Sequence, residues 1–322
     1  MKKHIVIKLL LVGGCAFIIS CVDDWSRCNP VHGPGRTAAQ NDDLFGVLYA
    51  NGLYVVTGEM ENSAQNGRDS GLVATSPSDS FFWTSRPSGT TNTLYGAAYG
   101  DSVFATVGTN GIVLTSQDGN TWTTRISATV PNLNGIIFAD GQFVTVGNRG
   151  TILTSVDGIS WTIRSSGTTE LLNSVAFGGN KFVAVGYGSD ISSSPDGATW
   201  TIKNSGTSAS LNGIYYGDSM FVAVGEHGTI ITSQDDSTWT IRSSGTTEFL
   251  NGITYGDNQF VCVGYGGLIL TSPDAVTWTI KSSGTESSIN GVAYTRAQFI
   301  AVGDNSTVLT SSDGVIWTSK AL

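Results

Sequence analysis

The sequence predicts an all-β protein, a seven-bladed β-propeller with four antiparallel strands in each blade. Tryptophan recurs every 39 residues, and short apolar runs alternate with Gly- and Asp-containing turns between the tryptophans. A fixed period of this length is typical of repeat proteins. Four short strands in a period of about 40 residues form one propeller blade. The tryptophans are Trp122, Trp161, Trp200, Trp239, Trp278 and Trp317.

Each copy of the repeat corresponds to one complete blade, from its first strand to its fourth. Six copies start at positions 94, 133, 172, 211, 250 and 289, and an earlier one starts at Leu44 with 11 additional residues. The last copy ends at Leu322, just after its fourth strand. We therefore predict a propeller over residues 44–322, in which blade seven packs on blade one without sharing a strand.

The copy at 133–171 illustrates the unit. Its apolar runs predict strands at 133–138, 142–146, 151–155 and 161–165. Ala139-Asp140-Gly141 between the first two strands is typical of a tight hairpin turn. No helical period appears in any copy.

The first 43 residues do not belong to the repeat. Met1-Lys2-Lys3, a short apolar stretch and Ser20 are typical of a secretory signal, and the stretch is shorter than the roughly 20 residues of a membrane span. The segment ending Ser20-Cys21 resembles a bacterial lipobox. That resemblance implies a signal peptide over 1–20, lipid on Cys21 and a tether over 21–43. Val22 then favours the outer membrane of a diderm cell; an ordinary signal peptide is the alternative.

Composition excludes several function classes. Residues 1–20 carry three lysines and no acid, so their removal takes the net charge from −9 to −12. An acidic surface argues against nucleic-acid binding, where Lys and Arg must neutralise phosphates. Cys28 and Cys262 remain after processing, too few for a disulfide framework. No His or Cys cluster has the spacing of a zinc site, so we expect no metal and no cofactor.

The turn before each repeated tryptophan carries a motif. It reads SQDGNTW at 116–122 and SVDGISW at 155–161, which resembles the Asp-box (BNR repeat) of sialidases and of photosystem II assembly-factor-like propellers. An Asp carboxylate can accept hydrogen bonds from turn N–H groups, so we predict a structural role for these aspartates. They are Asp118, Asp157, Asp196, Asp235, Asp274 and Asp313.

Binding is expected where the copies differ. The second-to-third turns vary most, and blade one holds its insertion in this turn. Variable loops on a repeated scaffold often carry binding function, although exposed hairpin tips can also drift without a role. The candidate ligand-binding residues are Arg68, Arg149, Tyr187, Glu226, His227, Tyr265, Asp304 and Asn305.

Two further sets repeat around the ring. Basic residues fall three positions after each tryptophan. They are interpreted either as charged edge-strand residues that block aggregation or as an anion-binding rim. Asparagines follow the first residue of five copies, where they either satisfy backbone groups or line a polar ligand channel. The two sets are Arg86, Arg125, Arg164, Lys203, Arg242, Lys281 and Lys320, and Asn134, Asn173, Asn212, Asn251 and Asn290.

Two functions follow from these patterns. The first is a monomeric, non-catalytic binding or assembly scaffold of the cell envelope, attached to the membrane by lipid alone, with a protein or glycan ligand. The alternative is a divergent sialidase-like glycoside hydrolase. His227 is the only histidine of the propeller, and nothing selects a pair of carboxylates for glycoside hydrolysis. We therefore favour the scaffold.

Overall fold

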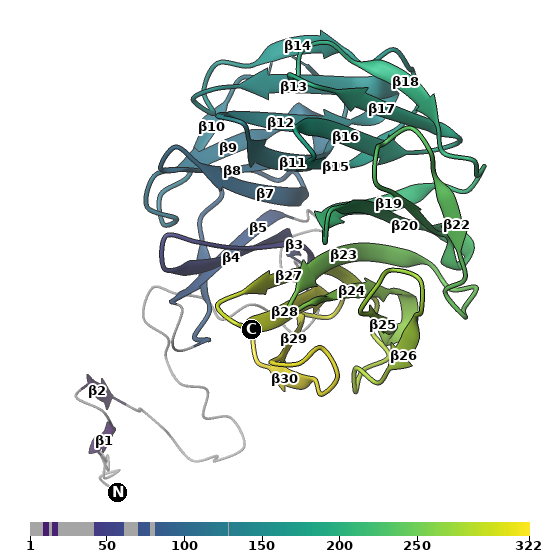
Figure 1. Ribbon diagram of the computed structural model, residues 1–322. Coiled ribbons are helices and arrows are strands. Elements are labelled where there is room, and N and C mark those ends of the chain that lie inside the picture. The colour runs from purple at the N-terminus through teal and green to yellow at the C-terminus, as the bar shows by residue number, and fades with distance from the viewer. Residues whose placement is uncertain (1–8, 13–14, 19–41, 61–69, 78–80, 128) are drawn as a thin grey trace, which may run out of the picture. The chain divides into compact units, whose positions relative to one another are not determined.

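The computed structural model describes residues 9–12, 15–18, 42–60, 70–77, 81–127 and 129–322 (Figure 1). Cys21 and Arg68 lie outside the described residues. The chain divides into two compact units, residues 1–36 and 37–322. Within the first unit, β1 (Leu9–Val12) and β2 (Cys15–Ile18) form an antiparallel pair. No helix in the described part of the chain is long and apolar enough to cross a membrane.

The second unit is a seven-bladed propeller, which confirms the predicted fold class. Each blade is a four-stranded antiparallel sheet whose strands follow one another in sequence. The first strand of each blade lies toward the axis of the ring, and the fourth lies at the rim (Figure 1). The first strands are β3 (Asp43–Ala50), β7 (Leu94–Gly100), β11 (Leu133–Ala139), β15 (Leu172–Gly178), β19 (Leu211–Gly217), β23 (Leu250–Gly256) and β27 (Ile289–Thr295).

The remaining strands complete blades one to seven in the same order. The second strands are β4 (Leu53–Met60), β8 (Val103–Gly108), β12 (Gln142–Gly147), β16 (Lys181–Gly186), β20 (Met220–Gly225), β24 (Gln259–Gly264) and β28 (Gln298–Gly303). The third strands are β5 (Ser70–Pro77), β9 (Val113–Ser116), β13 (Thr151–Ser155), β17 (Asp190–Ser194), β21 (Ile230–Ser233), β25 (Ile269–Ser272) and β29 (Thr307–Ser311). The fourth strands are β6 (Thr84–Arg86), β10 (Thr123–Arg125), β14 (Thr162–Ser165), β18 (Thr201–Asn204), β22 (Thr240–Arg242), β26 (Thr279–Lys281) and β30 (Thr318–Lys320).

The core consists of apolar layers between neighbouring blades. A fully buried aromatic ring occupies the second position of every second strand: Tyr54, Phe104, Phe143, Phe182, Phe221, Phe260 and Phe299. The repeated tryptophans pack beside these rings, with centroids about 6.4 Å apart for Phe182 and Trp200. Most of the tryptophans are only half-buried. The phenylalanines, rather than the tryptophans, are therefore the most deeply buried large side chains of the repeat.

The ring closes through contacts between side chains of blades seven and one. Gln298 Nε2 donates a hydrogen bond to Tyr54 Oη (2.6 Å), and Arg296 Nη1 donates to Tyr49 Oη (2.7 Å). The Arg296 guanidinium also lies 5.5 Å from the Tyr49 ring centroid. All four strands of blade one come from one continuous segment, so closure without a swapped strand is confirmed.

Candidate functional site

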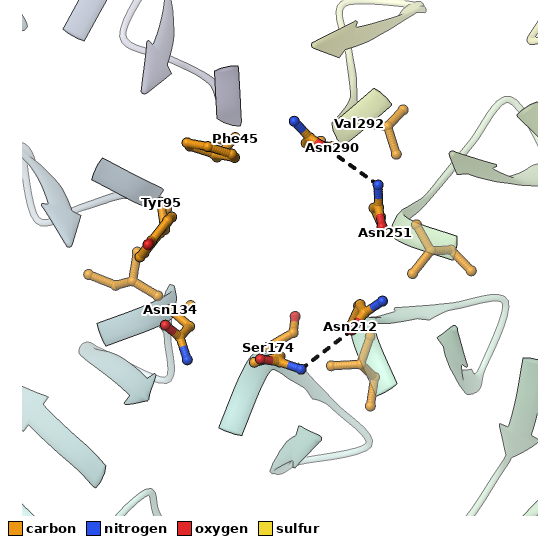
Figure 2. Close-up of a pocket in the computed structure, with 18 of the residues that line it drawn as sticks. Phe45, Tyr95, Asn134, Ser174, Asn212, Asn251, Asn290 and Val292 are labelled. Atoms are coloured by element: carbon orange, nitrogen blue, oxygen red, sulfur yellow. Dashed lines mark hydrogen bonds between the residues drawn. The ribbon is translucent and has the colours of Figure 1, made fainter. Parts of the chain in front are cut away.

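A β-bulge opens the first strand of every blade and sets the geometry of the central channel. The pairing with the second strand shifts at the second residue, for example between Leu133 and Gly135. A bulge can re-aim a side chain out of the alternating pattern. Seven side chains are thereby placed around the axis as a collar: Phe45, Tyr95, Asn134, Asn173, Asn212, Asn251 and Asn290 (Figure 2).

The five asparagines of the collar link each blade to the next. Asn134 Nδ2 donates to the Leu172 carbonyl (2.8 Å), and Asn290 Nδ2 donates across the closing joint to the Leu44 carbonyl (3.1 Å). Asn173, Asn212 and Asn251 donate to the following blade in the same way. The asparagines therefore satisfy backbone groups around the channel, as one of the two sequence interpretations expected.

Blades one and two interrupt this amide ring with an aromatic pair. Phe45 and Tyr95 occupy the asparagine position there, and their rings meet edge to face with centroids 5.4 Å apart. Burial, together with the nearby Glu59 carboxylate, raises the pKa of Tyr95 above its usual value. Glu59 itself accepts a hydrogen bond from Thr93 Oγ1 (2.6 Å). One side of the collar is thus aromatic and the other is made of amides (Figure 2).

The collar surrounds an axial pocket of about 490 Å³. Next along the first strands come six glycines and Ser174, and then a ring of small and branched aliphatic residues, which also line the pocket. The residues of this aliphatic ring are Val47, Ala97, Ile136, Val175, Ile214, Ile253 and Val292. None of the described residues that line the pocket is charged.

The variable turns surround the mouth of this pocket. In blades two to seven, the first residue of the turn donates its N–H to the carbonyl that precedes the first strand of the same blade, as Tyr187 does to Leu171 (2.8 Å). The collar is joined to the turns directly, because Asn290 Nδ2 donates to Asp304 (2.7 Å). We call the end of the propeller that carries the collar, these turns and the links between blades the loop face.

The candidate ligand-binding residues lie on the loop face but do not converge. Arg149, Tyr187, His227, Tyr265 and Asn305 are exposed, while Glu226 and Asp304 are half-buried. Each comes from the same turn of a different blade, apart from the pairs 226–227 and 304–305, so together they form an arc. The His227 ring lies 5.9 Å from the Phe249 ring of the next link.

Arg149 and His227 hold their turn tips in the left-handed backbone region. Arg149 has φ 58° and His227 has φ 54°, where non-glycine residues are uncommon apart from Asn, Asp and His. Asn110 and Gly266 hold the equivalent tips of blades two and six at φ 56° and 63°. In blades two, three, five and six the turn is therefore the same short 3-10 turn with different side chains, which is how a rigid scaffold presents variable groups.

The aspartate turns, residues 116–122 and their equivalents, lie at the opposite end of the blades. Asp118 Oδ1 accepts hydrogen bonds from the N–H groups of Thr121 and Asn120 (both 2.8 Å) and from Ser116 Oγ. These bonds favour the carboxylate and lower the pKa of Asp118 to about 2. The same contacts recur at the other five aspartates and lower their pKa values too.

Five of the seven basic residues of the fourth strands form hydrogen bonds or ion pairs with nearby side chains. Arg125 Nε donates to Thr115 Oγ1 on the adjacent strand (2.7 Å), and Arg86, Arg164 and Arg242 make the equivalent bond. Lys203 instead forms an ion pair with Asp236 (2.9 Å). No group of three or more His, Cys, Asp or Glu side chains in the described residues could hold a metal ion.

Comparison with solved structures identifies propellers of the same overall architecture. YCF48 bound to a D1 peptide superposes with a TM-score of 0.68 and 16% identity over 87% of this chain and 95% of the other. YCF48 from Cyanidioschyzon merolae gives 0.66 and 14% over 87% and 97%. A catalytically inactive virginiamycin B lyase from Staphylococcus aureus, solved with quinupristin, gives 0.73 and 10% over 95% and 98%.

The chain shares their fold. No protein-family model matches the sequence, and no curated protein does. At these identities the likeness establishes the seven-bladed architecture and leaves the function to the residues of the site.

Sequence reasoning missed the aromatic half of the collar. Phe45 and Tyr95 follow the first leucine of their copies, where five other copies have asparagine. This departure from the repeat was the available signal. That the position faces the axis could not be seen, because the bulge that re-aims it is set by the pairing of two strands.

Proposed function

We propose that this protein is a non-catalytic binding scaffold of the cell envelope, held by lipid on Cys21, whose loop face binds an extended segment of a protein partner. It acts as a monomer, without metal or cofactor. The observation that carries the proposal is the uncharged axial pocket at the centre of the variable loop face. The structure of YCF48 with a D1 peptide supports a peptide ligand, because it shows a peptide bound to a protein of this fold.

The chemistry of the pocket disfavours a glycoside hydrolase. Such enzymes generally use two carboxyl groups about 5–10 Å apart, and the described pocket wall carries none. Two acids close to the collar already accept hydrogen bonds from neighbouring side chains: Glu59 accepts from Thr93, and Asp304 accepts from the collar residue Asn290. If the ligand is a glycan, this pocket would bind it without cleaving it. The test below distinguishes a glycan ligand from a protein ligand.

The proposal is tested by capture of a partner from envelope extract with the purified protein and its variants. Tyr187 and Tyr265 are exposed by 58% and 59% on the loop face, and Val156 is exposed by 68% at an aspartate turn. We expect Tyr187→Ala and Tyr265→Ala to weaken capture about 10-fold or more, as for binding hot spots, with Val156→Ser as the control.

Two results would contradict the proposal. One is a partner lost with Val156→Ser and retained by both tyrosine variants, which would move the binding face to the aspartate turns. The other is capture that survives protease treatment of the extract and disappears after glycosidase treatment, which would replace the protein ligand by a glycan.

A further inference from the structure

We infer that the axial pocket receives one large apolar side chain of the partner, preferably an aromatic one, while the main chain on either side of it lies over the asparagine collar. This inference rests on the proposed function and specifies the feature of the partner that is recognised. It is argued from the layers of the pocket, from its asymmetry and from the absence of charge on its described wall.

The aliphatic ring of the pocket selects an apolar group. Seven of the lining residues are Val, Ile or Ala, so a polar group packed against them would lose its hydrogen bonds to water without replacement. Such burial is unfavourable unless new bonds form. An ammonium, a carboxylate or a sugar ring rich in hydroxyls is disfavoured for the same reason. Apolar side chains gain free energy in proportion to the area that they bury.

The glycine layer keeps this pocket narrow. A Cβ added to Gly135 would lie 2.9 Å from the Asn173 carbonyl oxygen, and one added to Gly291 would lie 2.5 Å from the Phe45 carbonyl oxygen. These glycines allow the inner strands of neighbouring blades to approach closely around the axis. A volume of about 490 Å³ lies in the lower half of the range of ligand pockets, so it has room for a large side chain and is too small for a folded segment.

The asymmetric collar favours an aromatic side chain over an aliphatic one. Phe45 and Tyr95 form a continuous aromatic wall, and aromatic pairs gain about 0.5–1.5 kcal/mol beyond the area they bury. On the opposite wall, the asparagine amides offer both donors and acceptors. Peptide N–H and C=O groups that flank the inserted side chain can pair with them.

The experiment uses capped amino acids as probes of the full-length protein. N-acetyl-L-tryptophanamide carries an aromatic side chain between two amides, and N-acetyl-L-alaninamide has the same amides without the ring. N-acetyl-L-lysinamide tests for a cation, and N-acetylglucosamine tests for a sugar. Saturation-transfer NMR and titration at millimolar probe should show the tryptophan probe binding at least about 10-fold more tightly than the other three, because a ring buries far more apolar area than a methyl group.

Repeat-consensus substitutions provide variants that preserve the fold. Tyr95→Asn introduces the residue that five other blades carry and removes the aromatic wall. Ala97→Ile introduces the residue that three other blades carry in the aliphatic ring and fills part of the pocket. Both variants should lose the tryptophan probe while keeping the thermal unfolding midpoint of the wild type. Val156→Ser changes an exposed side chain of an aspartate turn, outside the pocket, and should leave probe binding unaltered.

Several results would overturn this inference. They are unchanged probe binding in both Tyr95→Asn and Ala97→Ile, tighter binding of the lysine or sugar probe, and no saturation transfer from any probe. If partner capture still depends on Tyr187 and Tyr265 in that case, the proposed function stands and the axial pocket is not its recognition site. If partner capture did not depend on Tyr187 and Tyr265, the proposed function itself would be contradicted, whatever the probes show.

Discussion

Asp236 occupies a position where four of the seven blades have glycine, and its replacement tests how blades four and five are held together. Its side chain is fully buried and forms ion pairs with Lys181 Nζ (2.8 Å) and Lys203 Nζ (2.9 Å) of blade four. Ser193 Oγ also donates to it. Asp236→Asn keeps the size of the side chain and removes the charge, so both ammonium groups lose their charged partner and keep only neutral ones, the Asp235 carbonyl and Ser237 Oγ.

The expected loss of stability follows from the exposure of the three groups. Removing one partner of a buried ion pair costs about 3–5 kcal/mol, largely because the other charge is left buried. The side chains of Lys181 and Lys203 remain 33% and 26% exposed, so their ammonium groups can regain part of their hydration. We therefore expect Asp236→Asn to lower the free energy of unfolding by about 2–3 kcal/mol at pH 7.

The effect should depend on pH in a defined direction. Burial acts to raise the pKa of Asp236, but hydrogen bonds from Lys181, Ser193 and Lys203 outweigh it, and the pKa is lowered. A lowered pKa in the folded state gives stability that is complete above the unfolded value of about 3.9. That stability is lost as the pH falls through the folded value. The difference between wild type and Asp236→Asn should therefore shrink below about pH 4.

Urea unfolding followed by tryptophan fluorescence at several pH values measures this difference directly. Asp218→Asn is the control, because Asp218 is an exposed acid in a first-to-second turn of blade five and its replacement should change stability by less than about 0.5 kcal/mol. A cost for Asp236→Asn as small as that of the control would refute the reasoning. So would a cost that stays constant between pH 7 and pH 3, because the carboxylate charge would then contribute nothing.

Three further predictions concern the anchor, the core and the aspartate turns. Cys21→Ser should leave the precursor unprocessed or release the protein from the membrane, and wild-type protein free of lipid by mass spectrometry would contradict the lipobox resemblance. Phe182→Ala should cost about 3–5 kcal/mol in urea unfolding, and Trp239→Ala should cost less because Trp239 is half-buried; the reverse order would be inconsistent with the core described above. Because hydrogen bonds lower the pKa of Asp157, its stabilising effect should be full above about pH 4 and be lost in stronger acid, and an Asp157→Asn variant as stable as wild type at pH 7 would count against it.

The fold was largely predictable because residues that mark turns and core positions recur at fixed intervals along the sequence. Tryptophan, leucine and the Gly- and Asp-containing turns recur in register, and the predicted third strand of the 133–171 copy matches β13 at both ends. The importance of the buried Phe182 position was not recognised. Phenylalanine in a short apolar run gives no sign of whether it faces one neighbouring blade, two or none, whereas tryptophan stands out by its rarity.

The candidate site was predicted only in part. The variable turns do lie on one face, as the alternation of strand directions requires. The Asp236 cluster was not anticipated, because its partner Lys181 is 55 residues away in the chain and the contact depends on the distance between two blades. The collar was recognised only as a set of asparagines, since the role of Tyr95 becomes visible only once the bulge is known.

The position of the binding face can be measured most directly by hydrogen–deuterium exchange of the protein alone and with its captured partner. Binding at the loop face should slow exchange in the turns at 148–150, 187–189 and 265–267 and in the opening of β7 around Tyr95. The aspartate turns at 116–121 and 155–160 should exchange at the same rate in both states. Slower exchange confined to those aspartate turns, with the loop-face turns unchanged, would contradict the proposed binding face.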